Sequence, residues 1–415
     1  MRILCVAAAY PPHGKGGGPK ASETIAKALC SRGHTVRVIT VADDESFEAH
    51  DGVQIRTLRS LNLYWNYWRK DRSAAARLLW HALENFNPRA LLRMLREMVE
   101  FRPDIVVTIS VENVNVATWV AAWMLGCPSV HAIQSYFLMC WKGTMFSKNK
   151  NCERPCLQCR ATSIGKKFCS QLVDGVIAEA SHTLSLHREQ GFFRRAATRI
   201  IPGAVTGTTS SPSPCAAETD AIRVGYIGML TPNKGIGTLG AAAALLGDDV
   251  PYEYVIAGEG KPEFVQQVLS KFPASKTTYL GWVDPNSFYP LIDVLVVPSI
   301  WAEPFGYVCI EALSFGVPLI VARAGALPEI IDEKSGLVFA AGDHEELAVC
   351  LRRIASDRNL LKRLHCGALV RARQYTPATL AASFDTFLSQ VCASSKSRVR
   401  GSWKSQVRAS SKATG

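Results

Sequence analysis

The sequence predicts an α/β protein with two doubly wound halves that face a central cleft. Its 415 residues are too many for one hydrophobic core, which usually stops growing at roughly 250 to 300 residues. Short apolar segments alternate with segments of helical periodicity in residues 1–203, and the alternation restarts in residues 221–376. Residues 204–220, rich in Thr, Ser and Pro, separate the two halves as a linker. Such alternation is typical of parallel sheets covered by helices on both faces.

The first half opens on a strand. Residues 2–9 are apolar after Arg2, as in the central strand of a parallel sheet. The glycine cluster at 16–18 leads into a helix predicted over 21–30, and a second strand is predicted over 35–41. Later in this half, the pattern predicts a strand, a helix and a strand over 105–109, 116–125 and 129–133.

The second half repeats the pattern from residue 222. Its apolar segments predict strands over 222–227, 252–257, 278–280, 294–297 and 318–322, with helices over 237–246 and 262–269. A last helix is expected over 377–393. The tail 394–415 carries six Lys or Arg and no Asp or Glu, a composition that predicts disorder.

The charge of the chain calls for an acidic partner. A net charge of +12 suits nucleic acid, an anionic membrane or a phosphorylated substrate. No nucleic-acid recognition motif is present, so we expect no nucleic-acid partner. The basic segment 65–102, with Arg89, Arg93 and Arg96 among apolar residues, is compatible with amphipathic helices that contact an anionic membrane, or with an ordinary solvated helix face.

Location in the cell can be predicted from the apolar runs and the cysteines. The longest apolar stretch, 114–125, is shorter than the roughly 20 residues that cross a bilayer. The apolar start ends at Pro11 and Pro12 without a signal-peptidase pattern. Thirteen cysteines without a secretion signal predict reduced thiols. We therefore expect a cytoplasmic protein, with peripheral contact on the inner face of the membrane as a further hypothesis.

Two glutamates form the most informative pattern in the sequence. Glu303 follows a predicted buried strand, and Glu311 lies eight residues on, about two turns into a predicted helix. Between them, Phe305 and Gly306 bring free backbone N–H groups to the helix N-terminus, where an anion or a sugar hydroxyl can bind. The two carboxylates suit the hexose and ribose hydroxyls of one sugar nucleotide. The alternative is a pair of solvated helix-end glutamates.

The surrounding segment, EPFGYVCIEALSFGVPLI from Glu303 onward, resembles the retaining GT-B glycosyltransferases of family 4. Their signature is a Glu, seven residues and a second Glu in a setting like EPFGxxxxEAxxxGxPxI. The resemblance implies the GT-B fold, in which two Rossmann-like domains face a cleft. It also implies that Glu303 contacts the donor sugar and Glu311 the nucleotide ribose. No cofactor is implied, and no Asp-x-Asp triplet for a bound metal occurs.

A second motif, from Gly228 to Gly235, follows a predicted strand and opens a helix. A cation here can neutralise a diphosphate as the sugar leaves, because negative charge builds up on the leaving oxygens. The segment resembles a glycine, arginine and lysine-glycine run of the same family, which implies that Gly228 and Lys234 contact the donor and that Lys234 acts in catalysis with Glu303. Met229 stands where the family has its arginine. The alternative for Lys234 is a surface lysine at a helix start.

The first half carries the remaining donor-binding candidates. Gly16 and Gly17 lie at the first strand-to-helix turn, where glycine lets a substrate approach the backbone. They belong to a stretch that again resembles the family. Gln134 and Ser135 occupy the place where the family often has a His-Asp pair. A glutamine can still donate a hydrogen bond to the donor sugar, but it lacks the charge of an imidazolium.

A group of cysteines leaves two interpretations open. Cys140, Cys152, Cys156 and Cys159 end in a Cys-x-x-Cys pair, and four thiolates of this kind can hold a structural zinc ion. Spacing this irregular also occurs among unligated thiols. We therefore assign no metal to the predicted site.

These patterns together predict an enzyme that moves a hexosyl unit from a nucleotide sugar to a glycan or lipid-linked glycan, in cell-surface polysaccharide synthesis. Retention at the anomeric carbon is implied by the resemblance. One alternative is a sugar-nucleotide epimerase of the same architecture. Another is a catalytically inactive GT-B binding subunit, for which Met229 and Gln134 would be the signs.

Overall fold

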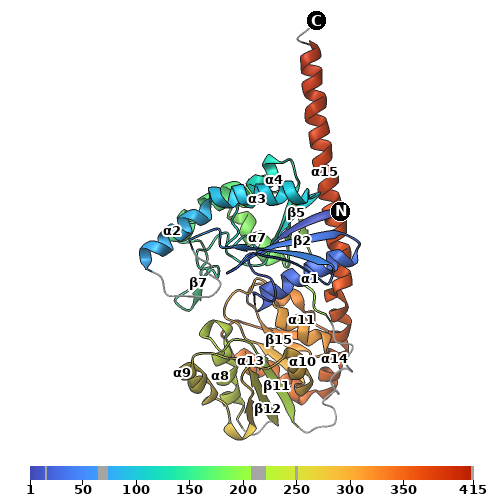
Figure 1. The fold of residues 1–415 in the computed structure, drawn as a ribbon. Coiled ribbons are helices and arrows are strands. Elements are labelled where there is room, and N and C mark those ends of the chain that lie inside the picture. Colours follow the sequence, from blue (N-terminus) through green and yellow to red (C-terminus); the bar gives the residue numbers. More distant parts are fainter. Residues whose placement is uncertain (15, 64–72, 207–220, 248–250, 413–415) are drawn as a thin grey trace.

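The computed structural model describes residues 1–14, 16–63, 73–206, 221–247 and 251–412. Figure 1 shows an N-terminal α/β half above a C-terminal α/β half, with the long helix α15 (Pro377–Lys412) running beside both. The residues of the expected linker from 207 to 220 lie outside the described part. Each half is built around its own sheet.

The N-terminal sheet has eight strands in the order β10-β9-β6-β5-β1-β2-β4-β3. All neighbours are parallel except β3 and β4, which pair antiparallel at one edge. Six of them, in the order β4-β2-β1-β5-β6-β9, follow the pattern 3-2-1-4-5-6 of a dinucleotide-type fold. The strands are β1 (Arg2–Val6), β2 (Thr35–Ala42), β3 (Ser46–His50), β4 (Val53–Arg59), β5 (Ile105–Thr108), β6 (Ser129–Ile133), β9 (Gly175–Ala178) and β10 (Ala197–Ile200).

Helices cover both faces of this sheet because successive side chains of a buried strand point to opposite faces. In β1, Ile3 and Cys5 pack against one face with α1, whereas Leu4 and Val6 pack on the other with α3. The helices of this half are α1 (Gly17–Ser31), α2 (Ala74–Asn85), α3 (Pro88–Phe101), α4 (Ala117–Met124), α5 (Leu157–Ala161), α6 (Ile164–Cys169) and α7 (Ser181–Glu189).

Helix α1 begins four residues before the predicted start at residue 21. Pro19 lies in its first turn, where the missing N–H of proline has no intrahelical partner to lose. Helix α3 begins with a clear local signal: the side chain of Asn87 accepts hydrogen bonds from the backbone N–H groups of Arg89 and Ala90, and Pro88 occupies the first helical position.

The C-terminal sheet has six parallel strands in the order β13-β12-β11-β14-β15-β16, again the 3-2-1-4-5-6 pattern. Its strands are β11 (Ile222–Ile227), β12 (Tyr252–Ala257), β13 (Thr277–Tyr279), β14 (Val294–Val297), β15 (Leu319–Ala322) and β16 (Gly336–Phe339). Its helices are α8 (Ile236–Leu246), α9 (Pro262–Leu269), α10 (Pro285–Phe288), α11 (Tyr307–Ser314), α12 (Leu327–Ile330), α13 (His344–Ser356) and α14 (Arg358–Ala372).

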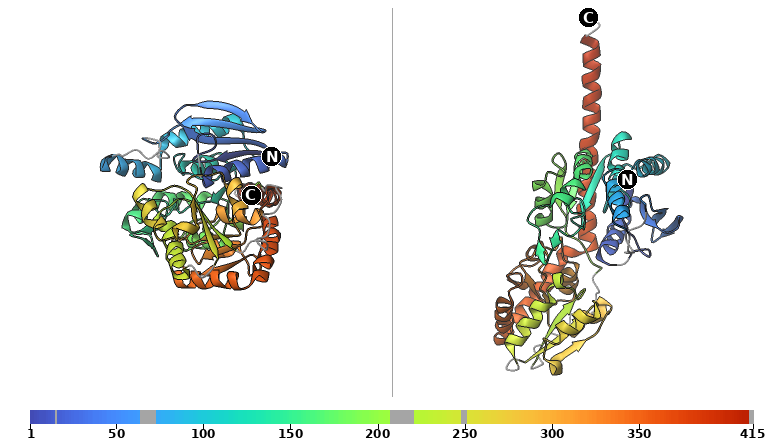
Figure 2. Two further views of the ribbon diagram at one scale, coloured as in Figure 1. Left: turned by 90° about the horizontal axis from the view of Figure 1, so that it is seen from below. Right: turned by 90° about the vertical axis from the view of Figure 1, so that its left-hand side faces the viewer.

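Helix α15 is longer than the sequence-based expectation. A helix over 377–393 followed by a disordered tail was expected, but one helix runs to Lys412 and projects beyond the body (Figure 2). No proline and only Gly401 interrupt this segment after Pro377, so the backbone meets no strong helix breaker. In addition, α15 leaves the C-terminal half and packs on the N-terminal half, where Leu380, Phe384 and Leu388 join the core beneath α1.

Candidate functional site

The loops that carry the predicted site lie where the strand order of each sheet reverses. In the C-terminal half, β11 and β14 are neighbours although they are far apart in sequence. Their carboxyl ends lead into the loops 228–235 and 298–306. Ligands of open α/β sheets bind at this point because the connections on its two sides diverge and leave a crevice.

Lys234 and Glu303 form an ion pair in this crevice. The Nζ of Lys234 lies 2.7 Å from Oε1 of Glu303, and the carboxylate belongs to a residue that is only 8% exposed. Burial raises the pKa of Glu303, while the Lys234 ammonium acts in the opposite direction. The same ammonium lies 4.8 Å from the centre of the Trp301 ring. The two residues predicted to act in catalysis are therefore in direct contact with each other.

Close backbone contacts hold this pair in place. Gly235 has a φ of 71°, and a Cβ atom there would lie 1.7 Å from the carbonyl oxygen of Pro298. The carbonyl of Asn233 accepts hydrogen bonds from the backbone N–H groups of Ile300 and Trp301, each at 3.1 Å. Only glycine permits this approach of the two loops. These contacts therefore hold together the backbones of the two loops that carry Lys234 and Glu303.

Glu311 lies in the second turn of α11 and lines a cavity of about 700 Å³ between the two halves. The hydroxyl of Tyr289 donates to its Oε2 at 2.9 Å, and burial raises the pKa of the carboxyl. Gly17 and Lys20 from α1 line the cavity from the N-terminal half, and Trp282 lines it from the C-terminal half. A volume of this size is within the range of small-molecule sites. The structure therefore brings Glu311 and Gly17 to one cavity.

The other predicted residues have more varied positions. Gly306 is the N-cap of α11 and has no side-chain cap, as expected for a helix start that offers its N–H groups, whereas Phe305 is buried against Tyr307. Gly228 directly follows β11 and has a φ of 152°. Gly16 has a φ of 104° and open space where a Cβ would stand.

Gln134 follows β6 at the carboxyl end of the N-terminal sheet. Its buried Nε2 has no hydrogen-bond partner among the residues that the structure describes. Buried amide donors normally have a hydrogen-bond acceptor, so this N–H is available to donate to a ligand. The glutamine can therefore serve in the way its chemistry predicts, as a neutral donor.

Sequence reasoning missed several residues of this cleft. Lys20 is one turn into α1, Trp282 comes from a loop of the C-terminal half, and Tyr289 begins a short 3-10 helix of that half. A lysine that follows a glycine-rich turn was the available signal for Lys20. The Met229 side chain is 64% exposed. Its backbone carbonyl accepts a hydrogen bond from the hydroxyl of Tyr226. Lys20 thus brings to this cavity a cation that the motif around Met229 does not supply.

The cysteine group is partly assembled. A hydrogen bond with the Cys159 thiol lowers the pKa of the Cys140 thiol below its usual range. In the described ranges, however, no three or more His, Cys, Asp or Glu side chains are grouped so that they could hold a metal ion. The arrangement therefore gives no support to the zinc interpretation.

Comparisons with known proteins identify the family of this chain. Residues 212–368 match the family described as glycosyl transferases group 1, and residues 16–204 match the glycosyl transferase 4-like domain. The chain belongs to the group 1 glycosyltransferases. This confirms the family and the enzyme class predicted from the segment around Glu303.

Relatives of this glycosyltransferase include a 42.6 kDa protein in the cps region of Klebsiella pneumoniae, 25% identical over 335 residues, which are 80% of this chain and 87% of the relative. Sucrose-phosphate synthase from Thermosynechococcus elongatus superposes with a TM-score of 0.74 at 19% identity, covering 95% of this chain and all of that one. HepE from Anabaena, in complex with UDP and glucose, gives 0.65 at 16% identity, covering 94% and 99%. These structures confirm the GT-B fold.

Proposed function

We propose that this glycosyltransferase moves a hexosyl unit from a nucleotide sugar to a hydroxyl of a glycan or lipid-linked glycan, with retention of anomeric configuration, in cell-surface polysaccharide synthesis. The observation that carries the proposal is the buried Lys234–Glu303 ion pair in the loops that follow β11 and β14. Glu311, in the helix that follows Glu303, lines the interdomain cavity of about 700 Å³. The cps-region relative and the UDP and glucose bound to HepE support the donor class and the biological role.

In this reaction the bond from the anomeric carbon to the diphosphate breaks, a bond to the acceptor oxygen forms, and the proton of the acceptor hydroxyl passes to the leaving diphosphate. Lys234 places its charge where the leaving diphosphate gains negative charge. Glu303 accepts hydrogen bonds from the hydroxyls of the transferred sugar, and Glu311 from those of the ribose. Gln134 adds a neutral donor from the opposite half. The existing ion pair therefore has to open enough for a diphosphate to reach Lys234.

The test is a thermal-shift screen with UDP, GDP and ADP and their hexose conjugates. A ligand at about 100 times its dissociation constant stabilises the folded state by roughly 2.7 kcal/mol. The donor so identified is then incubated with a panel of glycan acceptors, and the products are analysed. Turnover of the nucleotide sugar without an acceptor would indicate an epimerase. Binding without turnover on a broad panel would indicate an inactive binding subunit.

Turnover is expected without an added divalent metal. The sequence has no Asp-x-Asp triplet, and Lys234 stands where a metal would otherwise neutralise the diphosphate. Activity should therefore be the same in EDTA and in magnesium or manganese. Activity that is lost in EDTA and restored by either metal would contradict this expectation, and metal analysis of the protein as purified controls for a tightly bound ion.

Peripheral membrane contact is the second part of the proposal. No helix in the described part of the chain is long and apolar enough to cross a membrane. Within the basic segment 65–102, residues 65–72 lie outside the described part. Of the three named arginines, Arg93 is held by Glu45 and Glu97, each at 3.0 Å, so it is already paired. Arg89 and Arg96 are exposed on α3.

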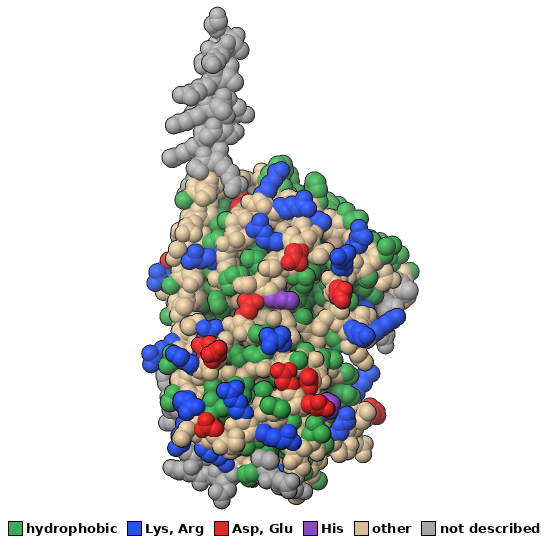
Figure 3. Space-filling view, turned by 180° about the vertical axis from the view of Figure 1, so that it is seen from behind, with side chains coloured by type: hydrophobic (Ala, Val, Ile, Leu, Met, Phe, Trp, Pro, Cys, Tyr) green, Lys and Arg blue, Asp and Glu red, His purple; other side chains and the backbone are tan. Residues whose placement is uncertain are grey.

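A stronger candidate for the surface that contacts a membrane lies on the short helices α5 and α6. Leu157 on α5 and Phe168 on α6 are 81% and 76% exposed, and Ile164 is also exposed. Helix α6 contacts α2 and α4, which expose further large apolar side chains. We call this set the apolar face: Leu78, Leu79, Trp123, Met124, Leu157, Ile164 and Phe168. Figure 3 shows hydrophobic side chains interspersed with Lys and Arg on the N-terminal half. We infer that these side chains form one patch, since exposed apolar patches mark contact sites for proteins or membranes.

The apolar face predicts reversible binding to anionic vesicles, because exposed Arg160 and Lys167 lie on the same short helices. Each Lys or Arg near such a surface contributes about 1 kcal/mol. Co-sedimentation should be strong at low salt and partial at roughly 1 M salt, where the Debye length falls to about 3 Å. Replacing Ile164 and Phe168 by Ser should remove the salt-resistant part.

Two further variants complete this test. Arg89→Gln with Arg96→Gln should weaken the salt-sensitive part, and Val349→Ser, an exposed apolar residue on α13, is the matched control that should bind like wild type. Equal binding to neutral and anionic vesicles, or no binding at low salt, would reject membrane contact.

A further inference from the structure

A second cavity, of about 260 Å³, lies within the N-terminal half. Its walls come from α2, from the loop after β5, and from the segment after β6. The lining residues are Trp80, Glu112, Asn113, Phe137, Trp141, Lys142 and Gly143. Three aromatic rings, a carboxylate and an amide therefore surround one small space.

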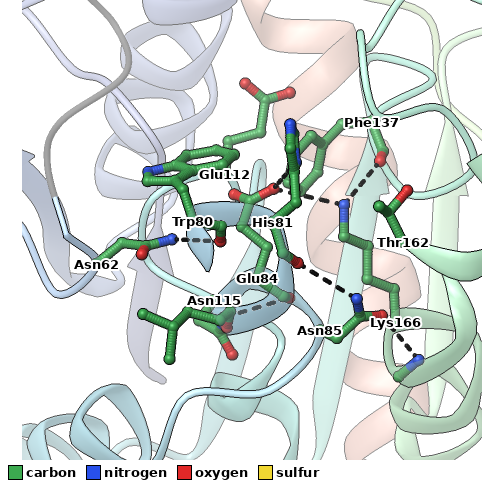
Figure 4. Close-up of polar contacts among 12 residues, drawn as sticks. Asn62, Trp80, His81, Glu84, Asn85, Glu112, Asn115, Phe137, Thr162 and Lys166 are labelled. Atoms are coloured by element: carbon green, nitrogen blue, oxygen red, sulfur yellow. Dashed lines mark hydrogen bonds and ion pairs between the residues drawn. The ribbon is translucent and has the colours of Figure 1, made fainter. Parts of the chain in front are cut away.

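Buried charges support one side of this cavity. Figure 4 shows the Lys166 ammonium pointing between the carboxylate of Glu84 and the backbone carbonyl of Phe137. The distances are 3.6 Å to Oε2 of Glu84 and 3.2 Å to the carbonyl oxygen, and Nζ lies 3.6 Å from the centre of the Phe137 ring. Lys166 and Glu84 are almost completely buried. Such pairs rarely add stability over apolar packing, so their use here points to a positioning role.

Glu112 carries the carboxylate that faces this cavity. Burial, reinforced by the negative charge of Glu84, raises the pKa of Glu112 to about 7, and Lys166 acts against the rise. The hydroxyl of Ser135 donates to its Oε1 at 3.2 Å. Strongly perturbed carboxyls in a cavity are typical of functional sites.

The backbone around Glu112 is also unusual. Asn113 has a φ of 62° and Asn115 a φ of 91°, both in the left-handed region. The Nδ2 of Asn115 donates to the carbonyl of Leu83 at 2.9 Å, which ties this loop to α2. Conformations of this kind persist where the surroundings enforce them, and they cluster at ligand sites.

One loop separates this cavity from the Lys234–Glu303 pair. The Tyr136 hydroxyl donates at 3.0 Å to the carbonyl of Ala302, the residue before Glu303. At the other end of the loop, the indole N–H of Trp301 donates to the carbonyl of Thr144, and Trp301 is the ring beneath the Lys234 ammonium. Phe137 and Gly143, next to these two contacts, line the cavity. The cavity therefore lies beside the reaction centre, on the side of the N-terminal half.

We propose that this cavity is the acceptor subsite, and that it holds one neutral sugar residue of the acceptor glycan. The apolar face of a pyranose ring packs on Trp141 and Trp80, while its hydroxyls donate to Glu112 and bond to Asn113. At about 260 Å³ the space is slightly smaller than the roughly 300 to 1,000 Å³ of sites for drug-sized ligands, which suits a single sugar unit. The assignment rests on the proposed function, because the cavity binds the acceptor of that reaction.

The test uses soluble probes and the full chain. A panel of methyl and p-nitrophenyl hexosides is screened by saturation-transfer NMR, with UDP or the donor nucleotide from the thermal-shift screen present to fill the other cavity. At least one hexoside should bind. Trp141→Ala and Glu112→Gln should each weaken that binding at least tenfold, and both should keep the wild-type thermal shift with the nucleotide.

Matched controls come from β3, the edge strand of the same sheet. Phe47→Ala and Glu48→Gln remove an exposed ring and an exposed carboxylate there, and both should bind the hexoside like wild type. The proposal is overturned if no hexoside binds to wild type, or if binding is unchanged in the Trp141 and Glu112 variants. A normal nucleotide shift with either of these results would leave the donor site, and thus the proposed function, intact.

Discussion

Replacing Glu303 by Ala is expected to reduce sugar transfer by roughly 100-fold or more, the scale of losing one preorganised polar contact in a transition state. The carboxylate is 8% exposed, bonded to Lys234, and held by backbone contacts on both sides. It therefore cannot be replaced by a neighbouring group or by bulk water. Initial rates with the identified donor and acceptor measure the effect.

Glu303→Gln is the matched variant because it keeps the shape and a hydrogen-bonding oxygen but removes the charge. If charge on Glu303 matters, the Gln variant should also be slow, while both variants keep a cooperative thermal transition. Wild-type rates in Glu303→Ala would show that the donor sugar is bound elsewhere.

Lys234→Ala is expected to weaken nucleotide-sugar binding by roughly 10- to 100-fold, because hydrogen bonds to charged groups are worth about 1.5 to 3 kcal/mol. Turnover should fall further, since the lost charge acts mainly on the leaving diphosphate. The variant also leaves the Glu303 carboxylate buried beside Trp301 without its cation. Its thermal stability should therefore drop as well.

A double-mutant cycle separates these two effects. Combining Lys234→Ala with Glu303→Gln removes both charges, so the stability lost in the single Lys234→Ala variant should return, at least in part. Nucleotide binding and turnover should not return. Unchanged nucleotide affinity in Lys234→Ala would place the diphosphate site away from the loop 228–235.

The alternation of strands and helices predicted both sheets because it is a local pattern. Residues 35–41, 129–133 and 294–297 all became strands at or next to the predicted positions. The motif residues Glu303 and Lys234 could be named for the same reason. Their direct ion pair could not be predicted, because 69 residues separate them and only the pairing of β11 with β14 brings their loops together.

Features that depend on contacts between distant segments could not be predicted from the sequence. Trp80, Glu112 and Lys166 come from three separate segments, and each alone has an ordinary reading as a packed or solvated residue. Lys20 became relevant only when α1 met the C-terminal half across the cavity. The helical continuation to Lys412 also went against a prediction that used composition alone.

The return of α15 to the N-terminal half has a practical consequence for protein engineering. Leu380, Phe384 and Leu388 complete the core under α1, and Asp385 pairs with Arg32 and His34 of the first half. A folding unit that corresponds to the N-terminal half is therefore discontinuous in sequence. A chimaera designed to exchange the donor-binding half with that of a relative should be spliced at two points, near residues 221 and 376, so that the host keeps its own α15.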